Sequence, residues 1–353
     1  MSIIILYNIL IIINIIITYY STNWLIIWVL IELTTISIII LISQNSNPRT
    51  IEATAKYFLI QSLASIVLLI GISLNYYLYN SLNIFNLYNE LTYNLIIIGL
   101  LIKIAIFPNP FWFIDVISGI NMTHSIYIII FSKLIPLYLY FIISYQNLFN
   151  ITIIIGLISI IFGSLLGINQ LNIRKIIGFS SINHLGWIIL SFPLLSGNIC
   201  TFLFTSYIIM LIPILWNLSI SNVTSLIKSS NSYFNNINIY ISIISILSLA
   251  GLPPLIGFFY KWIILNIIIT NDYIIISIIM IISSLLSLFF YLQLCFSFNS
   301  IYWPELKIIL LLNFNNNATF STTNIIYTII IILNLIIITS LIIINPLTNL
   351  WWI

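Results

Sequence analysis

The sequence predicts an all-α protein that crosses a membrane many times, and three observations support this fold class. Only 4% of its 353 residues are Asp, Glu, Lys or Arg, whereas a soluble domain carries roughly a quarter. Hydrophobic residues make up 62% of the chain, which leaves too few polar side chains to cover a soluble fold. Long apolar runs alternate with short clusters of Asn, Ser, Pro and charged residues. The net charge of +3 is too small and too scattered to indicate binding of nucleic acid.

The apolar runs divide the chain into eleven candidate transmembrane helices. A bilayer core of roughly 30 Å requires about 20 helical residues. The first run lacks a charged segment and a cleavage site, so we interpret it as a span rather than a signal peptide. The expected spans are Ile3–Tyr20, Asn23–Ser43, Tyr57–Tyr79, Tyr93–Phe107, Thr123–Ile143, Ile151–Ile168, Asn172–Phe192, Ile199–Ile220, Ile237–Asn266, Tyr273–Phe298 and Asn324–Ile344. No gap between them fits a soluble domain, so we expect a single transmembrane domain over residues 1–353.

The basic residues expected in the loops are unevenly distributed between the two sides of the membrane in this span count. The basic ones, all on one side of the membrane, are Arg49, Lys56, Arg174, Lys175, Lys228 and Lys307. Glu90 and Asp272 fall on the opposite side, without any Lys or Arg. Basic loops face the cytoplasm, or the matrix in a mitochondrion. The N-terminus is therefore expected on that side.

Four ionisable residues remain inside the expected spans: Glu32, Lys103, Lys133 and Lys261. Each would cost about 2.5–3.5 kcal/mol if it faced lipid, so we expect them to face one another, water or polar backbone. One interpretation is a proton path, because moving a carboxylate toward or away from a buried lysine switches its protonation. The alternatives are a static ion pair for Glu32 and a side chain reaching the membrane surface for Lys261.

Prolines interrupt two of the spans that carry lysines. They are Pro108 and Pro110, which follow Lys103, and Pro253 and Pro254, which precede Lys261. A broken helix is tolerated in a membrane where it lines a cavity or packs on protein. The two segments lie five spans apart and so cross in opposite directions, which predicts inverted repeats at about residues 1–143 and 149–298. A C-terminal helix at about 324–344 follows them, and simple packing kinks are the alternative.

Two histidines are candidate proton relays, since histidine titrates near neutral pH. His184 lies in the seventh expected span, with Ser180 and Ser181 at helical spacing from it, and His124 begins the fifth. Structural histidines satisfied by hydrogen bonds are the alternative. No phosphate loop, dinucleotide fingerprint, catalytic triad or cysteine cluster occurs in the sequence. Redox or nucleotide chemistry is therefore expected elsewhere than in this chain.

Three stretches resemble signature segments of the mitochondrial NADH dehydrogenase subunit 2 family of respiratory complex I. They are "NPRTIEATAKYFLIQSLAS" (Asn47–Ser65), "IRKIIGFSSINHLGW" (Ile173–Trp187) and "LAGLPPLIGFFYKW" (Leu249–Trp262). The resemblance covers most of the chain and implies an antiporter-like, proton-pumping membrane subunit with two discontinuous helices. By motif match, the glutamate and three lysines of the family's proton axis fall on Glu32, Lys103, Lys133 and Lys261.

The resemblance also implies cofactors, partners and location. This chain would bind no cofactor, because NADH, FMN, iron–sulfur clusters and ubiquinone are bound by partner subunits of the complex. Those partners would be the other membrane-arm subunits, including neighbouring antiporter-like subunits, together with membrane lipids. The chain would be a multi-pass protein of the mitochondrial inner membrane, with its N-terminus on the matrix side.

The sequence departs from the family pattern at both proline breaks. Pro110 stands where the family usually has histidine, and Tyr260 stands where a proline often precedes the last lysine. A relay role at position 110 is therefore not expected. Two alternative functions stay open: a cation/proton antiporter subunit of the same fold, and a structural spacer with static charge pairs.

Overall fold

A computed structural model describes residues 2–44, 47–85, 89–144, 149–221 and 236–299. Within these ranges every named element is helical, and an isolated β-bridge joins Asn23 and Asn83. The elements are α1 (Ser2–Tyr20), α2 (Trp24–Ile42), α3 (Pro48–Tyr79), α4 (Glu90–Ile104), α5 (Phe111–Gly119), α6 (Met122–Ile126), the π-helical turn η1 (Tyr127–Phe131), α7 (Ser132–Ser144), α8 (Phe149–Ile168), α9 (Ile173–Ser191), the 3₁₀ turn η2 (Phe192–Leu194), α10 (Gly197–Ser221), α12 (Asn236–Ala250), α13 (Ile256–Thr270) and α14 (Ile274–Asn299).

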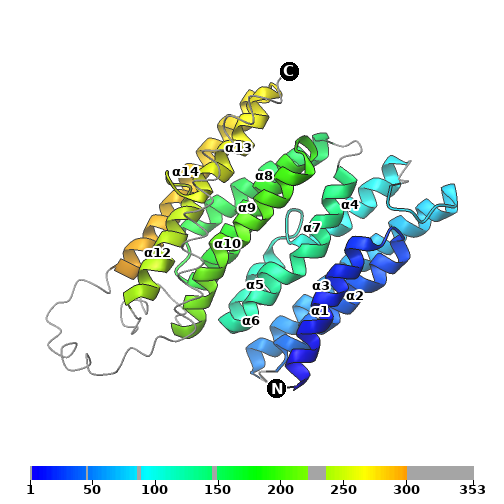
Figure 1. Ribbon diagram of the computed structural model, residues 1–353, viewed down its shortest axis with the longest axis horizontal. Helices are drawn as coiled ribbons and strands as arrows, with labels where there is room; N and C mark the ends of the chain where they lie inside the picture. Colours follow the sequence, from blue (N-terminus) through cyan, green and yellow to red (C-terminus); the bar gives the residue numbers. More distant parts are fainter. Residues whose placement is uncertain (1, 45–46, 86–88, 145–148, 222–235, 300–353) are drawn as a thin grey trace, which may run out of the picture.

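The helices lie side by side in a bundle whose order follows the chain (Figure 1). The blue helices α1–α3 form one end, the yellow and orange helices α12–α14 form the other, and α4–α10 lie between them. Helix α3 packs on α4 and α5, α4 on α7, α5 on α9, α9 on α8 and α10, and α10 on α12. A continuous series of helix contacts therefore links the two ends of the bundle.

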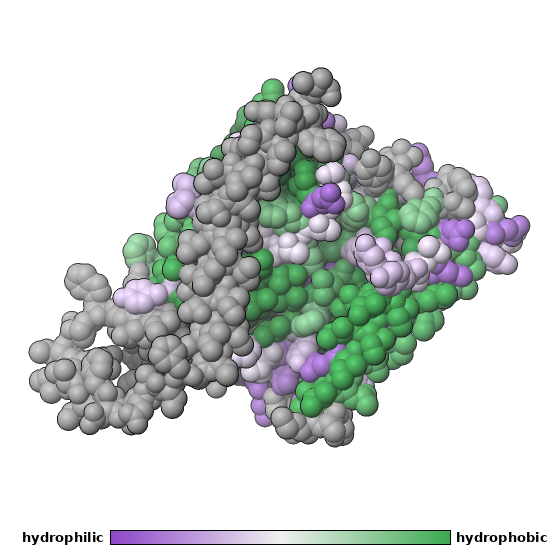
Figure 2. Space-filling view, viewed as in Figure 1, coloured by the Kyte–Doolittle hydropathy of each residue, from purple (hydrophilic) through white to green (hydrophobic). Residues whose placement is uncertain are grey.

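The outer surface of the N-terminal helices is apolar. Figure 2 shows a broad hydrophobic surface there, with hydrophilic residues gathered toward its ends. On α1 the exposed stripe consists of Ile5, Ile9, Ile12 and Ile16, each about half exposed. Such a stripe is unfavourable in water and favourable against lipid. The fold is that of a protein that spans a membrane.

Helix α9 is the central element of the bundle. Every residue from Ile176 to Ser191 is buried, which is the pattern of a helix surrounded by protein on all sides. Its contact with α8 is close because glycines stand at the interface. A Cβ on Gly163 would lie 2.8 Å from the backbone nitrogen of Asn183, and one on Gly186 would collide with Ser159. Small residues let membrane helices approach in this way.

The helical, multi-span prediction is confirmed, but the number eleven is not. Among the described residues, six segments are long and apolar enough to cross a membrane: Trp24–Ile42, Pro48–Tyr79, Met122–Ser144, Ile173–Leu194, Gly197–Ser219 and Ile274–Phe298. Shorter apolar helices cover Ile4–Tyr20, Thr152–Ile168, Tyr240–Ala250 and Ile256–Thr270. The expected eleventh span, Asn324–Ile344, lies outside the described residues, as do Lys228 and Lys307.

The C-terminal end predicted for the fourth span, Tyr93–Phe107, is wrong. Helix α4 stops at Ile104, and a second helix, α5, starts at Phe111 beyond the prolines. Ala105 adopts a left-handed conformation (φ 69°), and its N–H donates to the carbonyls of Leu101 and Ile102. This cap ends α4 before Phe107 is reached. Helix α5 was not predicted from the sequence, because its nine residues are too few to be recognised as a span.

The two proline breaks share one backbone geometry. Gly251 (φ 82°) ends α12 as Ala105 ends α4, 146 residues earlier. After each of them the next N–H donates five residues back, to Leu101 in the first break and Leu247 in the second. Phe107–Pro108 and Pro253–Pro254 are both cis. Corresponding positions in two halves of the chain thus carry the same interruption; the boundaries of the repeats remain a prediction.

Two basic residues that were expected in loops lie close together at one end of the bundle. Arg49 lies in the first turn of α3 and Arg174 in the first turn of α9. Arg174 Nη1 donates to the carbonyl of Ile120 at 2.7 Å, and a Cβ on the adjacent Gly119 would lie 3.0 Å from the Arg49 carbonyl. Glu90 starts α4, after the loop that follows the far end of α3.

Candidate functional site

Lys103 and Glu32 form an ion pair inside the bundle. Lys103 Nζ lies 3.1 Å from Glu32 Oε1. The lysine side chain is 1% exposed and the glutamate 26%, so the carboxylate is the more accessible partner. Lys103 stands in the last turn of α4, where the helix dipole favours a cation. Glu32 lies in the middle of α2.

Helix α3 supplies polar groups around this pair. Gln61 Nε2 donates to the backbone carbonyl of Lys103 at 3.4 Å. The buried hydroxyl of Tyr57 interacts electrostatically with Glu32. Both residues lie near the pair because α3 packs against α2 and α4. The pair therefore has polar neighbours rather than hydrocarbon around it.

Lys133, in α7, is buried against α5 and α9. Its side chain is 1% exposed, and no carboxylate of the described residues lies within ion-pair distance of it. Its Nζ lies 3.8 Å from the centroid of the Phe113 ring and 3.5 Å from Ser181 Oγ. A cation–π contact and a hydroxyl thus stand in for a counter-ion.

Lys261 is held by the backbone of the second break. Its Nζ donates to the carbonyl of Ala250 at 2.8 Å, at the C-terminal end of α12, where carbonyls lack helical partners. The side chain is 8% exposed, and Nζ lies 5.9 Å from the Trp187 ring. Pro253 and Pro254 belong to the loop that turns the lysine back onto this carbonyl.

His184 lies at the centre of a group of three tyrosines. The centroids of the Tyr207 and Tyr260 rings are each 5.7 Å from its own, and that of Tyr291 is 6.4 Å away. His184 Nε2 lies 3.1 Å from the Tyr291 hydroxyl. Tyr260 donates its hydroxyl proton to the His184 backbone carbonyl at 2.9 Å.

Ser180 and Ser181 lie on α9, one turn before His184, as the spacing predicts. Each donates to a carbonyl of its own helix, Ser180 to Ile177 at 2.8 Å and Ser181 to Gly178 at 2.7 Å. Ser181 Oγ also accepts a hydrogen bond from Lys133 Nζ at 3.5 Å. The seventh span therefore joins the lysine of the fifth span to the histidine group.

His124 lies apart from the other candidates. It is half-buried, near the basic end of the bundle, and its ring stacks on Tyr127 at 6.4 Å between centroids. No described contact links it to the four ionisable residues. The π-helical turn Tyr127–Phe131 separates it from Lys133. The relay role of His124 remains a prediction that no contact supports.

Two features of the site had no clear signal in the sequence. The tyrosines around His184 come from three different helices, and ring contacts between such helices cannot be read from spacing. Asp115, in α5, pairs with Lys56 at 3.5 Å, and Lys56 pairs with Glu52 at 2.8 Å. Only the Glu52–Lys56 pair, four residues apart on α3, was readable from the sequence.

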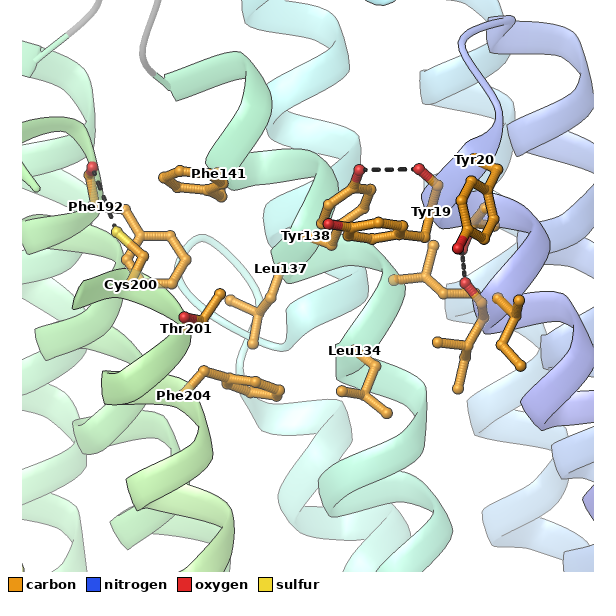
Figure 3. Close-up of a pocket in the computed structure, with 14 residues that line it drawn as sticks. Tyr19, Tyr20, Leu134, Leu137, Tyr138, Phe141, Phe192, Cys200, Thr201 and Phe204 are labelled. Atoms are coloured by element: carbon orange, nitrogen blue, oxygen red, sulfur yellow. Dashed lines mark hydrogen bonds between the residues drawn. The ribbon is translucent and has the colours of Figure 1, made fainter. Parts of the chain in front are cut away.

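A separate apolar cavity of about 380 Å³ opens between α1, α7 and α10 (Figure 3). Tyr19, Tyr20 and Tyr138 stand at one side of it, and the Tyr138 hydroxyl donates to the Tyr19 carbonyl at 3.3 Å. None of the four ionisable residues lines this cavity. The three lysines are instead enclosed within the helix contacts.

A cofactor site is not evident among the described residues. They contain no group of three or more His, Cys, Asp or Glu side chains placed to hold a metal ion. The chemistry that the described side chains offer is proton transfer between amines, a carboxylate, an imidazole and hydroxyls.

Comparisons with known proteins give the family. Residues 21–287 match the family model described as NADH:quinone oxidoreductase/Mrp antiporter, transmembrane. The NADH-ubiquinone oxidoreductase chain 2 of Strongylocentrotus purpuratus is 35% identical over 293 residues, which cover 82% of each chain.

Solved structures share the fold at lower identity. A chain of the Mrp complex from Dietzia sp. superposes with a TM-score of 0.76 at 18% identity, over 84% of this chain and 60% of that one. A chain of respiratory complex I from Thermus thermophilus with bound aureothin gives 0.72 at 21%, over 79% and 66%. The aligned part of the present chain thus covers 60% of the matched chain in the first structure and 66% in the second.

Proposed function

This chain belongs to the NADH:quinone oxidoreductase/Mrp antiporter transmembrane family, and from that premise we propose that it is a proton-translocating subunit of NADH:ubiquinone oxidoreductase. Its partners are the other membrane-arm subunits, and the redox cofactors and ubiquinone are bound by partner subunits. It lies in the mitochondrial inner membrane with its N-terminus on the matrix side. The basic end of the bundle, with Arg49 and Arg174, supports this orientation.

The ion pair between Lys103 and Glu32 is the observation that carries the proposal. A lysine that is 1% exposed keeps its proton only while a negative charge compensates for its burial. Moving Glu32 away favours release of the proton from Lys103, and its return favours uptake. Because Glu32 is 26% exposed, it is the member that movement of a neighbouring subunit reaches first.

The proton then has further acceptors along the bundle. Lys133 and Lys261 are buried without a carboxylate among the described residues, one beside a ring and a hydroxyl, the other on a backbone carbonyl. These neutral partners stabilise the ammonium form enough for either amine to accept a proton. They stabilise it less than a carboxylate would, so the proton can also be released. Each proton moved against 100 mV requires about 2.3 kcal/mol, which quinone reduction in partner subunits supplies.

We expect Lys103→Met to leave the complex assembled and to lower the number of protons pumped per electron pair. The measurement is the proton-to-electron ratio of the purified complex in sealed vesicles. Lys56→Met is the matched control, because it removes an exposed lysine that pairs only at the surface. A normal ratio for Lys103→Met would remove Lys103 from the path.

The two alternative functions give different outcomes. In a structural spacer, replacing both Glu32 and Lys103 by leucine would be tolerated or even stabilising, since apolar residues often replace a buried pair without loss. In a pump the double variant assembles and fails to translocate. An antiporter without a redox partner would purify free of flavin and iron–sulfur subunits.

A further inference from the structure

The hydroxyl of Tyr291 is the only side-chain hydrogen-bonding partner of the His184 ring among the described residues. It lies 3.1 Å from Nε2, while Nδ1 is buried without a partner. Tyr291 comes from α14 and is 1% exposed. It lies outside all three sequence stretches that carry the family resemblance.

The unpaired ring nitrogen gives this contact a direction. Nδ1 has no hydrogen-bond partner among the described residues, and a buried N–H without an acceptor is rarer in proteins than a buried acceptor without a donor. The ring proton therefore belongs on Nε2, which donates to the Tyr291 oxygen at 3.1 Å. A ring tautomer is assigned from such a network.

We propose that Tyr291 is a positioning residue for proton transfer, holding His184 as the Nε2-protonated tautomer with Nδ1 as the acceptor. Nδ1 binds one proton and later releases the same proton, so the imidazole ends unchanged. This inference rests on the proposed function and adds to it the residue that fixes the relay.

The position of His184 suits transfer between two of the lysines. Ser181, three residues earlier on α9, contacts Lys133. Tyr260, which binds the His184 carbonyl, is the residue before Lys261, and the imidazole interacts electrostatically with that lysine. The histidine therefore lies between groups that lead to both amines.

The test is Tyr291→Phe, which removes one oxygen and keeps the ring that packs on Phe290. We expect the complex to assemble and to pump protons roughly tenfold more slowly, the factor that corresponds to losing one hydrogen bond of ordinary strength. Tyr140→Phe is the matched control. Tyr140 is fully buried and donates to another carbonyl of α9, that of Ile189, at 3.1 Å.

A double variant separates positioning from packing. If Tyr291 acts through the imidazole, Tyr291→Phe combined with His184→Gln pumps no more slowly than His184→Gln alone. Losses that multiply would overturn the proposal, and so would a Tyr291→Phe rate equal to that of Tyr140→Phe.

Two further observations keep the outcome decisive. If Tyr291→Phe fails to assemble, Tyr291→Gln, whose amide oxygen can accept from Nε2–H, is compared with Tyr291→Leu, which has no acceptor, and the leucine variant should pump more slowly. A Lys103→Met defect with normal pumping in Tyr291→Phe, or with equal rates in the glutamine and leucine variants, overturns this inference and leaves the proposed function standing. A normal Lys103→Met variant overturns the proposed function itself.

Discussion

The two proline breaks share their backbone geometry, but the lysine beside each break has a different kind of partner. In the first break the lysine precedes the interruption, and its ammonium pairs with a carboxylate from another helix, Lys103 Nζ to Glu32 Oε1 at 3.1 Å. In the second break the lysine follows the interruption and folds back onto the exposed carbonyl of Ala250 at 2.8 Å. A carboxylate on a separate helix can move, whereas a peptide carbonyl is fixed by the fold.

If the proposed function holds, this difference indicates which break would respond first to a neighbouring subunit. Glu32 is partly exposed on α2, so its distance from Lys103 can change without unfolding. Lys261 has no such movable carboxylate partner among the described residues. In the proposed function its protonation therefore depends on whether the other groups of the path hold a proton. We therefore interpret the first break as the driven end and the second as the responding end.

The packing of the two breaks also differs. Gly257, at the start of α13, lies against the carbonyl of Ser248 in α12. The corresponding residue in the first break, 146 positions earlier, is Phe111, which is 54% exposed. Helix α13 contacts α12, whereas α5 packs on α3 and α9. The second break is the tighter of the two.

The largest effect is expected from Gly257→Ala. The added Cβ would collide with the Ser248 backbone carbonyl, which cannot move as a side-chain end could, so we expect a loss of about 3 kcal/mol or more and poor assembly. Phe111→Ala should change stability by less than about 0.5 kcal/mol, as exposed sites do. Thermal unfolding and yield of the purified complex measure both. Equal losses would remove the difference in packing.

An intermediate effect is expected from coupling between charges. Glu32→Gln and Lys103→Met share one ion pair, so their effects on unfolding should depart from additivity by about 1–3 kcal/mol. Glu32→Gln and Lys261→Met should add to within about 0.5 kcal/mol, because Lys261 bonds to the backbone instead. The two double-mutant cycles are read from thermal unfolding of the assembled complex. Strong coupling in the second cycle would contradict the view that the lysines are held independently.

The smallest effect is expected at the left-handed residues. Gly251→Ala should destabilise by about 1–2 kcal/mol, because φ is 82° and the new Cβ would lie 2.9 Å from Lys261 Cδ. Ala105→Gly, the reverse exchange at φ 69°, should stabilise by less than about 1 kcal/mol. Melting temperatures of the two variants should therefore shift in opposite directions. Shifts of the same sign would mean that the shared geometry is not what limits either site.

Composition and apolar run length were sufficient to predict the helical fold, because the bilayer allows few other structures. The same rarity of charge isolated Glu32, Lys103, Lys133 and Lys261, and the structure buries all three lysines. It pairs Lys103 with Glu32, a contact that both the proton-path and the static-pair interpretations allow. Whether these residues carry protons stays a prediction.

What the sequence could not supply depends on contacts between distant segments. Asp115 follows an apolar stretch with no charge nearby in sequence, yet it meets Lys56 from α3. Tyr291 reaches His184 across 107 residues. A sequence pattern shows which face of one helix is apolar or polar. It does not show which helices pack against each other. The end of α4 was missed because the cap depends on the conformation of Ala105 rather than on residue type.

The glycine contacts between α8 and α9 have a consequence for motion. With Gly163 against Asn183 and Gly186 against Ser159, the two backbones touch, and neither helix can roll past the other without steric overlap. This pair serves as a stationary frame, so any travel of charge past His184 proceeds by rotation of hydroxyls and the imidazole. Amide hydrogens along α9 should consequently be among the slowest in the chain to exchange with deuterium, even during turnover.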